Sequence, residues 1–175
     1  MLCSVRRVTR PAPWYADSVE FDKLLAVLRA FHDEAVEYVL VGGAALNLHG
    51  LVRATVDVDF FIRPDAANVE RIRRALRRVW DDAEIDGIAA ADLAGEYAVV
   101  RYGPPDETLV VDLIARVGEA FSFDDVQWSI MEVEGVPARV ATPEMLYRLK
   151  RDTGRPIDRA DAAALKEKFG LTEEQ

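Results

Sequence analysis

Short apolar runs alternate along this chain with longer segments whose apolar residues recur at helical spacing. Apolar runs that end at glycine or proline are typical of buried strands, and apolar residues three and four apart mark one face of a helix. We predict strands over residues 38–41, 56–62, 97–102, 108–114, 126–133 and 136–140. Helices are predicted over residues 18–31, 44–49, 65–79, 142–150 and 159–169, with Ser18, Asp65 and Thr142 as N-caps. This order predicts an α/β (α+β) fold in which helices flank one short mixed sheet.

A length of 175 residues suits a single domain. Residues 1–16 carry two prolines and no clear period, so we predict an N-terminal arm there and one domain over residues 17–175. No apolar run approaches the roughly 18 residues that a membrane span needs. No apolar stretch follows the early arginines as a secretory signal requires, so we expect a cytoplasmic protein. The single cysteine, Cys3, excludes an internal disulfide and a cysteine zinc site.

The chain is acidic, with a formal net charge of −9 and a sequence pI of about 4.8. Affinity for phosphates rests on Lys and Arg, so such a chain binds nucleic acid poorly unless it presents a local basic patch. One candidate patch is the helical face that carries Arg71, Arg73, Arg74, Arg77 and Arg78. The alternative is that this face is simply solvated.

Two aspartates lie two positions apart in the apolar strand predicted over residues 56–62. Residues two apart in a strand point to the same face, so Asp57 and Asp59 project together. Side-by-side carboxylates repel each other unless a cation lies between them, and all-oxygen ligands suit Mg²⁺ or Mn²⁺. Asp112 lies in a similar apolar strand. If the two strands are neighbours, three carboxylates converge as a two-metal site requires; otherwise Asp112 is a satisfied structural carboxylate.

A glycine pair, Gly42 and Gly43, separates the strand predicted over residues 38–41 from the next helix. Glycines let backbone N–H groups approach an anion closely, and the N-terminus of a following helix favours negative charge. By itself such a pair is a common turn. Followed at this distance by Asp-x-Asp on a strand, it indicates a phosphate site beside a metal site.

These motifs resemble those of a known superfamily. Val41-Gly42-Gly43, a spacer of thirteen residues and Asp57-Val58-Asp59-Phe60 are similar to the signature of the polymerase-β-like nucleotidyltransferases. The run over residues 42–59, with its His-Gly and Arg-x-Thr, resembles the small bacterial nucleotidyltransferases related to AbiEii-type toxins. The C-terminal residues that are similar to that group's Lys…Arg-x-Lys-Asp-x-x-Asp ending are Lys150, Arg155, Asp158 and Asp161, with Ile157 where a lysine is common.

The resemblance implies a polymerase-β-like nucleotidyltransferase fold and a transfer of a nucleotide from a nucleoside triphosphate to an acceptor hydroxyl. It implies metal ligation and catalysis by Asp57, Asp59 and Asp112, with the last receiving the proton of the acceptor. It implies that the nucleotide is bound by Gly42, Gly43, Arg53, Thr55 and Lys150. The plainer interpretations are that Lys150 is a surface lysine, Arg155 and Asp158 an i,i+3 ion pair, and His49 a packing group.

The residues leave the acceptor open. The toxin-like segment and the five arginines lead us to hypothesise a tRNA 3′ end as acceptor, and an antitoxin protein that holds the chain in check. An enzyme that nucleotidylates a small molecule such as an antibiotic needs no basic face and is one alternative. A non-catalytic nucleotide-binding or antitoxin module is another, and the presence of all three carboxylates disfavours it.

Overall fold

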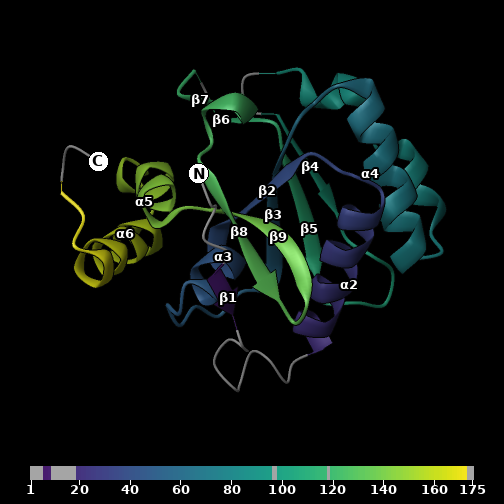
Figure 1. The fold of residues 1–175 in the computed structure, drawn as a ribbon. Helices are drawn as coiled ribbons and strands as arrows, with labels where there is room; N and C mark the ends of the chain where they lie inside the picture. Colours follow the sequence, from purple (N-terminus) through teal and green to yellow (C-terminus); the bar gives the residue numbers. More distant parts are fainter. Residues whose placement is uncertain (1–5, 9–18, 96–97, 118, 173–175) are drawn as a thin grey trace, which may run out of the picture.

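The computed structural model describes residues 6–8, 19–95, 98–117 and 119–172, with backbone alone for residues 6–8, 19 and 20. Ser18, the predicted cap, and Tyr97, the predicted start of a strand, lie outside these residues. Seven strands form one sheet in the spatial order β1-β8-β9-β2-β3-β5-β4 (Figure 1). Their bounds, in chain order, are β1 Arg6–Val8, β2 Tyr38–Val41, β3 Asp57–Ile62, β4 Val99–Tyr102, β5 Val110–Ile114, β8 Trp128–Val133 and β9 Val136–Ala141.

The sheet is mixed, as predicted. Strand β9 runs parallel to β2 and β3 runs parallel to β5, whereas the pairs β8–β9, β2–β3 and β4–β5 are antiparallel. The sequence did not predict β1, which pairs in parallel with β8 at the sheet edge. A strand of three residues is too short to show a period, so only its pairing reveals it. A separate two-stranded sheet joins β6 Arg116–Val117 to β7 Phe121–Ser122.

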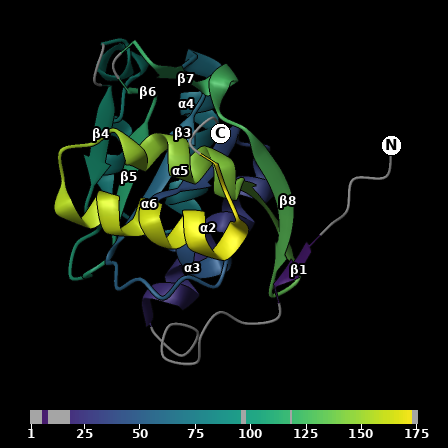
Figure 2. The same ribbon diagram turned by 90° about the vertical axis from the view of Figure 1, so that its left-hand side faces the viewer.

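Helices cover both faces of the large sheet (Figures 1 and 2). Helices α2 Val19–Asp33 and α4 Ala66–Val79 pack together on one face. The other face carries α3 Gly42–Leu48, α5 Pro143–Arg151 and α6 Pro156–Phe169. Three short 3₁₀ helices complete the described chain: η1 Ala83–Gly87, η2 Ala90–Leu93 and η3 Phe123–Asp125. None of the described helices has the length and apolar character needed to cross a bilayer.

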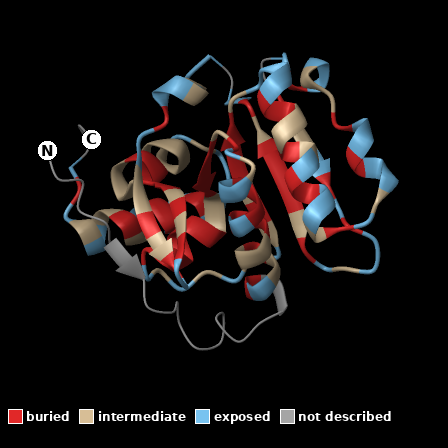
Figure 3. Cartoon of the chain, turned by 45° about the vertical axis from the view of Figure 1, so that its right-hand side comes forward, coloured by how far each residue is buried: buried red, intermediate tan, exposed pale blue. Residues whose placement is uncertain are grey.

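Alternation along β3 decides which side chains enter the core. Val58, Phe60 and Ile62 are buried toward α2, and the Phe60 ring lies 4.8 Å from that of Phe31 and 5.5 Å from that of Tyr38. Figure 3 shows the buried residues gathered on the strands and on the helix faces turned toward them. Burial of this apolar set fixes the register of β3, because a slip of one residue would exchange its two faces.

The predicted N-caps that the structure describes are confirmed. The Asp65 carboxylate accepts a hydrogen bond of 2.9 Å from the Asn68 N–H at the start of α4, and Thr142 accepts one from Met145 at the start of α5. Helix α6 begins at Pro156, three residues before the predicted start at 159. Proline is favoured in the first turn because its missing N–H has no intrahelical partner there.

Asn68 ties α4 to both strands that lead to the site. Its side chain is fully buried, accepts a hydrogen bond from the Glu37 N–H at 2.8 Å, and donates to the carbonyls of Glu37 and Arg63, each at 2.9 Å. Glu37 precedes β2 and Arg63 follows β3. One amide group therefore bonds three backbone groups, and of these the Glu37 carbonyl also accepts from the Arg63 N–H at 3.2 Å.

We expect Asn68→Ala to lower the free energy of unfolding by roughly 2 to 4 kcal/mol, because it removes three hydrogen bonds and takes the Asn68 partner from the Glu37 N–H and the Arg63 carbonyl. Urea denaturation followed by circular dichroism measures the change. Asp65→Ala is the matched control, since it removes only the cap of the same helix and should cost about 1 kcal/mol. Equal losses in the two variants would show that the Asn68 network adds nothing beyond an ordinary cap.

Candidate active site

A cleft of about 310 Å³ opens between the sheet and the helices α5 and α6. In Figure 2 these helices lie in front of β3, β5 and β4. The glycine turn, the end of the loop before β3, and strands β3, β4 and β5 form its floor, and α5, α6 and their connection form its wall. Its lining includes every residue that the sequence indicated for metal or nucleotide: Gly42, Gly43, Arg53, Thr55, Asp57, Asp59, Asp112 and Lys150.

The three carboxylates share one face of the sheet. Asp59 of β3 is the direct register partner of Asp112 on the parallel neighbour β5, and Asp57 lies two residues before Asp59. The condition set by the sequence, that the two strands be neighbours, is therefore met. Asp112 is buried, whereas the Asp57 side chain is 41% exposed at the rim of the cleft.

The grouping of the three carboxylates disfavours the charged form of Asp59. Burial, and after it the nearby carboxylates of Asp112 and Asp57, raise the pKa of Asp59 to about 6, and the attraction of Lys150 and Arg155 offsets only part of the rise. The Asp59 carboxyl group is therefore held in a place where its own charge is disfavoured. A cation among these carboxylates would relieve that repulsion.

The glycine pair is required by close packing. Gly42 has a φ of +65°, and a Cβ atom there would lie 1.9 Å from the Asp59 Oδ2 atom. A Cβ atom on Gly43 would lie 2.9 Å from the Cβ of Thr55. Any side chain at Gly42 would displace the Asp59 carboxylate, so this glycine has a purpose beyond that of a turn.

Asn47 was not singled out from the sequence, although it orders the loop before β3. This buried side chain donates to the Arg53 carbonyl at 2.7 Å and accepts from the Arg53 N–H at 2.8 Å. Thr55 then donates through its hydroxyl to the Asp57 carbonyl at 2.9 Å. The available signal was a lone asparagine between two leucines of a helix, because a buried amide needs partners.

Lys150 is neither on the surface nor free. Its side chain is 12% exposed, and its Nζ lies 2.8 Å from Asp158 Oδ1 and 2.9 Å from Asp161 Oδ2. The Arg53 Nε atom lies 3.4 Å from Asp161. Lys150 and Arg53, which approach from different elements, are thus held at the cleft by carboxylates of α6.

Arg155 and Asp158 form the i,i+3 ion pair that was one of the two interpretations, with 2.7 Å between Nε and Oδ2. Burial alone would raise the pKa of Asp158, but hydrogen bonds from Lys150 and Thr153 outweigh it and hold that pKa below its usual value. Asp158 is therefore a charged anchor for the cations of the cleft. The Arg155 side chain is 76% exposed and also lines the cleft.

Arg101 is a second residue that sequence reasoning missed. It lies on β4 in register with Asp112, donating to its two oxygens at 2.8 and 2.7 Å, and its terminal nitrogen is 3.8 Å from Asp57. Within the described chain no three His, Cys, Asp or Glu side chains stand as a ready metal-ligand set. The Asp112 carboxylate is instead hydrogen-bonded to the Arg101 guanidinium. An arginine on an edge strand far from any motif gives no sequence signal, because only strand order makes it a neighbour.

His49 lies outside the cleft lining. Its Nε2 atom is 2.8 Å from the Ala141 carbonyl, and its ring packs edge-on against Phe169 at 5.9 Å. The packing role is therefore the one that the structure supports.

The arginine face of α4 is not a free basic patch. Helix α4 covers the sheet face opposite to that of the cleft (Figure 1), and none of its arginines lines the cleft of the carboxylates. Arg74 lies 2.9 Å from Glu34 and Arg78 lies 3.0 Å from Asp33. The other three arginines also have acidic partners: Arg71 pairs with Glu37, Arg73 with Glu70, and Arg77 with Asp86. Acidic side chains thus neutralise all five charges.

A mixed sheet with helices on both faces and paired carboxylates beside a Gly-Gly turn defines a polymerase-β-like nucleotidyltransferase fold. The chain belongs to the family described as nucleotidyl transferase AbiEii toxin, Type IV toxin–antitoxin system, which matches residues 23–150. It is therefore a transferase of nucleotidyl groups. No curated protein matches this chain to a significant degree.

Solved structures share the fold at low sequence identity. ANT(2″)-Ia in complex with adenylyl-2″-tobramycin has a TM-score of 0.54 and 14% identity, over 90% of this chain and 92% of that one. A protein from Thermotoga maritima named as a nucleotidyltransferase has a TM-score of 0.53 and 14% identity, over 91% and 94%. An antigenic nucleotidyltransferase-like protein from Paracoccidioides brasiliensis has a TM-score of 0.50 and 18% identity, over 83% and 75%. These likenesses establish the architecture.

We expect Asp59→Asn to stabilise the metal-free protein at neutral pH. The folded pKa of about 6 lies above the ordinary 3.8, so the folded state binds this proton more tightly than the unfolded state does. The protonated Asp59 therefore contributes fully to the free energy of unfolding below about pH 4, and this contribution is lost as the pH rises to about 6. Above that pH the variant should gain on the order of 2 to 3 kcal/mol, because each tenfold difference in proton affinity between the two states corresponds to about 1.4 kcal/mol.

Urea unfolding of both proteins in EDTA, at intervals between pH 4 and pH 7.5, measures this difference. Asp106→Asn is the matched control, because Asp106 is an exposed turn residue outside the cleft. A stability difference for Asp59→Asn that does not grow with pH would contradict the assignment of the electrostatic cost to this carboxylate.

Proposed function

We propose that this chain transfers a nucleoside monophosphate from a nucleoside triphosphate to an acceptor hydroxyl, assisted by Mg²⁺ or Mn²⁺ at Asp57, Asp59 and Asp112. The observation that carries the proposal is the register of β3 and β5, which sets Asp59 beside Asp112 in a cleft lined with cations. The donor set fits such an ion, because carboxylate oxygens are the ligands that these hard cations prefer.

The charge balance of the cleft supports the need for a cation. Four cationic side chains line it, namely Arg53, Arg101, Lys150 and Arg155. Four acidic side chains also line it, namely Asp57, Asp59, Asp112 and Asp158. Lining charges that cancel cannot by themselves attract a strongly anionic triphosphate. A divalent cation would supply the missing positive charge and neutralise the phosphates during transfer.

In the proposed reaction the oxygen of the acceptor hydroxyl forms a bond to the α-phosphorus, and the bond from that phosphorus to the β-phosphate oxygen breaks. Pyrophosphate leaves with the electron pair of the broken bond. The hydroxyl proton passes to Asp112, which acts as general base. The remaining work of the protein is to hold the two reactants in line and to offset charge.

The nucleotide-binding roles follow the lining of the cleft. We assign the triphosphate to the backbone at Gly42 and Gly43, which lines the cleft beside Asp59 and Thr55, because N–H groups of glycines can approach an anion closely. Arg53 and Thr55 border this position from the loop that Asn47 holds. Lys150 acts from within its pair of aspartates, so it contributes a fixed charge rather than a mobile one.

Substituting the carboxylates should separate binding from chemistry. We expect Asp57→Asn with Asp59→Asn to abolish metal-dependent triphosphate binding, measured by calorimetry with Mg²⁺, because both side chains are proposed ligands. Asp112→Asn should keep much of this binding and lose transfer by about a hundredfold or more, as expected for loss of a general base. Undiminished triphosphate affinity in the double variant would remove the metal assignment, and near-normal turnover in Asp112→Asn would show that Asp112 is not the general base.

For the acceptor we propose a tRNA 3′ end, with the chain acting in the cytoplasm as the toxin of a Type IV toxin–antitoxin pair. Support comes from the toxin family to which the chain belongs, since a toxin has to modify a component on which growth depends. The arginines of α4 lend no support, because they are paired and lie across the sheet. A small-molecule acceptor, such as the tobramycin in the ANT(2″)-Ia complex, is the alternative.

Incubation with each labelled triphosphate and total tRNA distinguishes these acceptors. We expect metal-dependent label in RNA that is lost in Asp112→Asn. The triple alanine variant of Arg71, Arg74 and Arg78 should retain the label, because these side chains lie on the far face. Triphosphate binding without incorporation from any of the four triphosphates would favour the small-molecule acceptor. Loss of label in a triple variant that still folds would indicate that the arginines of α4 contact the RNA acceptor.

A further inference from the structure

Arg101 lies between two of the proposed metal ligands. Because β4 and β5 are antiparallel neighbours with Arg101 opposite Asp112, the guanidinium reaches the carboxylate directly across the strands. Its Nε donates to Asp112 Oδ1 at 2.8 Å and its terminal nitrogen to Oδ2 at 2.7 Å, with Asp57 Oδ2 at 3.8 Å from the same nitrogen. A two-pronged bond of this kind is the strongest form of arginine–carboxylate pair.

This pair and a metal ion exclude each other electrostatically. Both Asp112 oxygens accept from the guanidinium, and the Asp112 side chain is only 9% exposed. A divalent cation bound to the same carboxylate would lie within a few ångströms of a positive charge, where like charges repel strongly. The hydrogen bonds and attraction of Asp112, with a further attraction from Asp57, raise the pKa of Arg101, so protonation equilibria do not remove that charge.

The guanidinium is nevertheless free to leave. The Arg101 side chain is 64% exposed, and among the described residues its ion pairs are those with Asp112 and Asp57 alone. Lys150 differs, because it is almost buried and is held by two aspartates of α6 that are not proposed metal ligands. Of the two cations, only Arg101 therefore pairs with aspartates that are also proposed metal ligands.

We propose that Arg101 is an internal competitor of the divalent metal: it neutralises Asp112 and Asp57 in the metal-free protein and must swing away before a metal ion can bind to Asp112. This inference rests on the proposed function, since it takes these aspartates as ligands. Arg101 thereby sets the metal affinity of the site. If the pair is closed about nine-tenths of the time, the apparent dissociation constant of the metal is about tenfold higher than that of the open site.

Direct measurement of Mn²⁺ binding without nucleotide tests the proposal. Free Mn²⁺ is followed by electron paramagnetic resonance as the ion is titrated into wild-type protein and Arg101→Gln. We expect the variant to bind Mn²⁺ about tenfold more tightly, because the competing charge is gone. Mn²⁺ should also raise the melting temperature of Arg101→Gln more than that of the wild type, since tighter binding stabilises the folded state more.

Two further variants keep the test decisive. Arg101→Lys retains the charge without the two-pronged bond, so its affinity should lie between the other two, and it carries the test if Arg101→Gln does not fold. Arg74→Gln removes an arginine that pairs with Glu34 on the opposite face, and it should bind Mn²⁺ as the wild type does. Equal or weaker binding by both Arg101 variants, beside clear binding by the wild type, overturns the proposal. Absence of binding by every protein overturns the metal assignment itself.

Discussion

The parallel pairing of β3 with β5 is the constraint on which this site depends. It sets Asp59 directly beside Asp112, and alternation along β3 brings Asp57 to the same face. The same alternation sends Val58, Phe60 and Ile62 into the core beneath α2. The apolar face thus fixes the sheet face on which the carboxylates lie, because a slip of one residue would turn them inward and expose the aromatic core to water.

Three carboxylates on one face would repel each other in isolation, and the surrounding elements supply the opposing charge. Arg101 comes from β4, Arg53 from the loop before β3, Lys150 from α5 and Arg155 from the start of α6. The cations from the loop and the two helices are held by Asp158 and Asp161 of α6, whereas Arg101 is held by the site itself. The charges that line the cleft are therefore balanced, and Arg101 is the cation that pairs with two of the three carboxylates.

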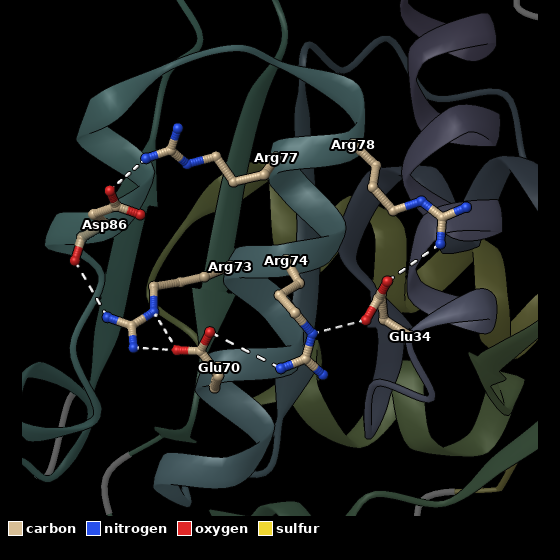
Figure 4. Close-up of a pocket in the computed structure, with 7 residues that line it drawn as sticks. All are labelled: Glu34, Glu70, Arg73, Arg74, Arg77, Arg78 and Asp86. Carbon is tan, nitrogen blue, oxygen red and sulfur yellow. Dashed lines mark hydrogen bonds and ion pairs between the residues drawn. The ribbon is translucent and has the colours of Figure 1, made fainter.

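The two faces of the sheet use arginine in different ways. On α4 five arginines join acidic partners on or near α2, α4 and η1, at positions mostly exposed to water. Figure 4 shows Arg73, Arg74, Arg77 and Arg78 beside Glu34, Glu70 and Asp86. Such surface pairs contribute little each to stability. In the cleft the partner of Arg101 is buried, so removal of the guanidinium would leave a carboxylate with neither solvent nor a cation. The same residue type thus forms weak surface pairs on one face and balances a buried carboxylate on the other.

The sequence by itself determined the strands and helices around the site, the Gly-Gly turn and the aspartate pair, because these depend on periodicity and on spacing within one segment. Its motifs also indicated the superfamily that the fold and the family match confirm. Only the tertiary structure decided that Asp112 meets Arg101, that Asn47 orders the loop at Arg53, and that the arginines of α4 face away from the carboxylates. These contacts depend on strand order, register and the choice of sheet face, which bring together residues far apart in the chain. A local sequence pattern therefore cannot predict which distant charged residues will be neighbours.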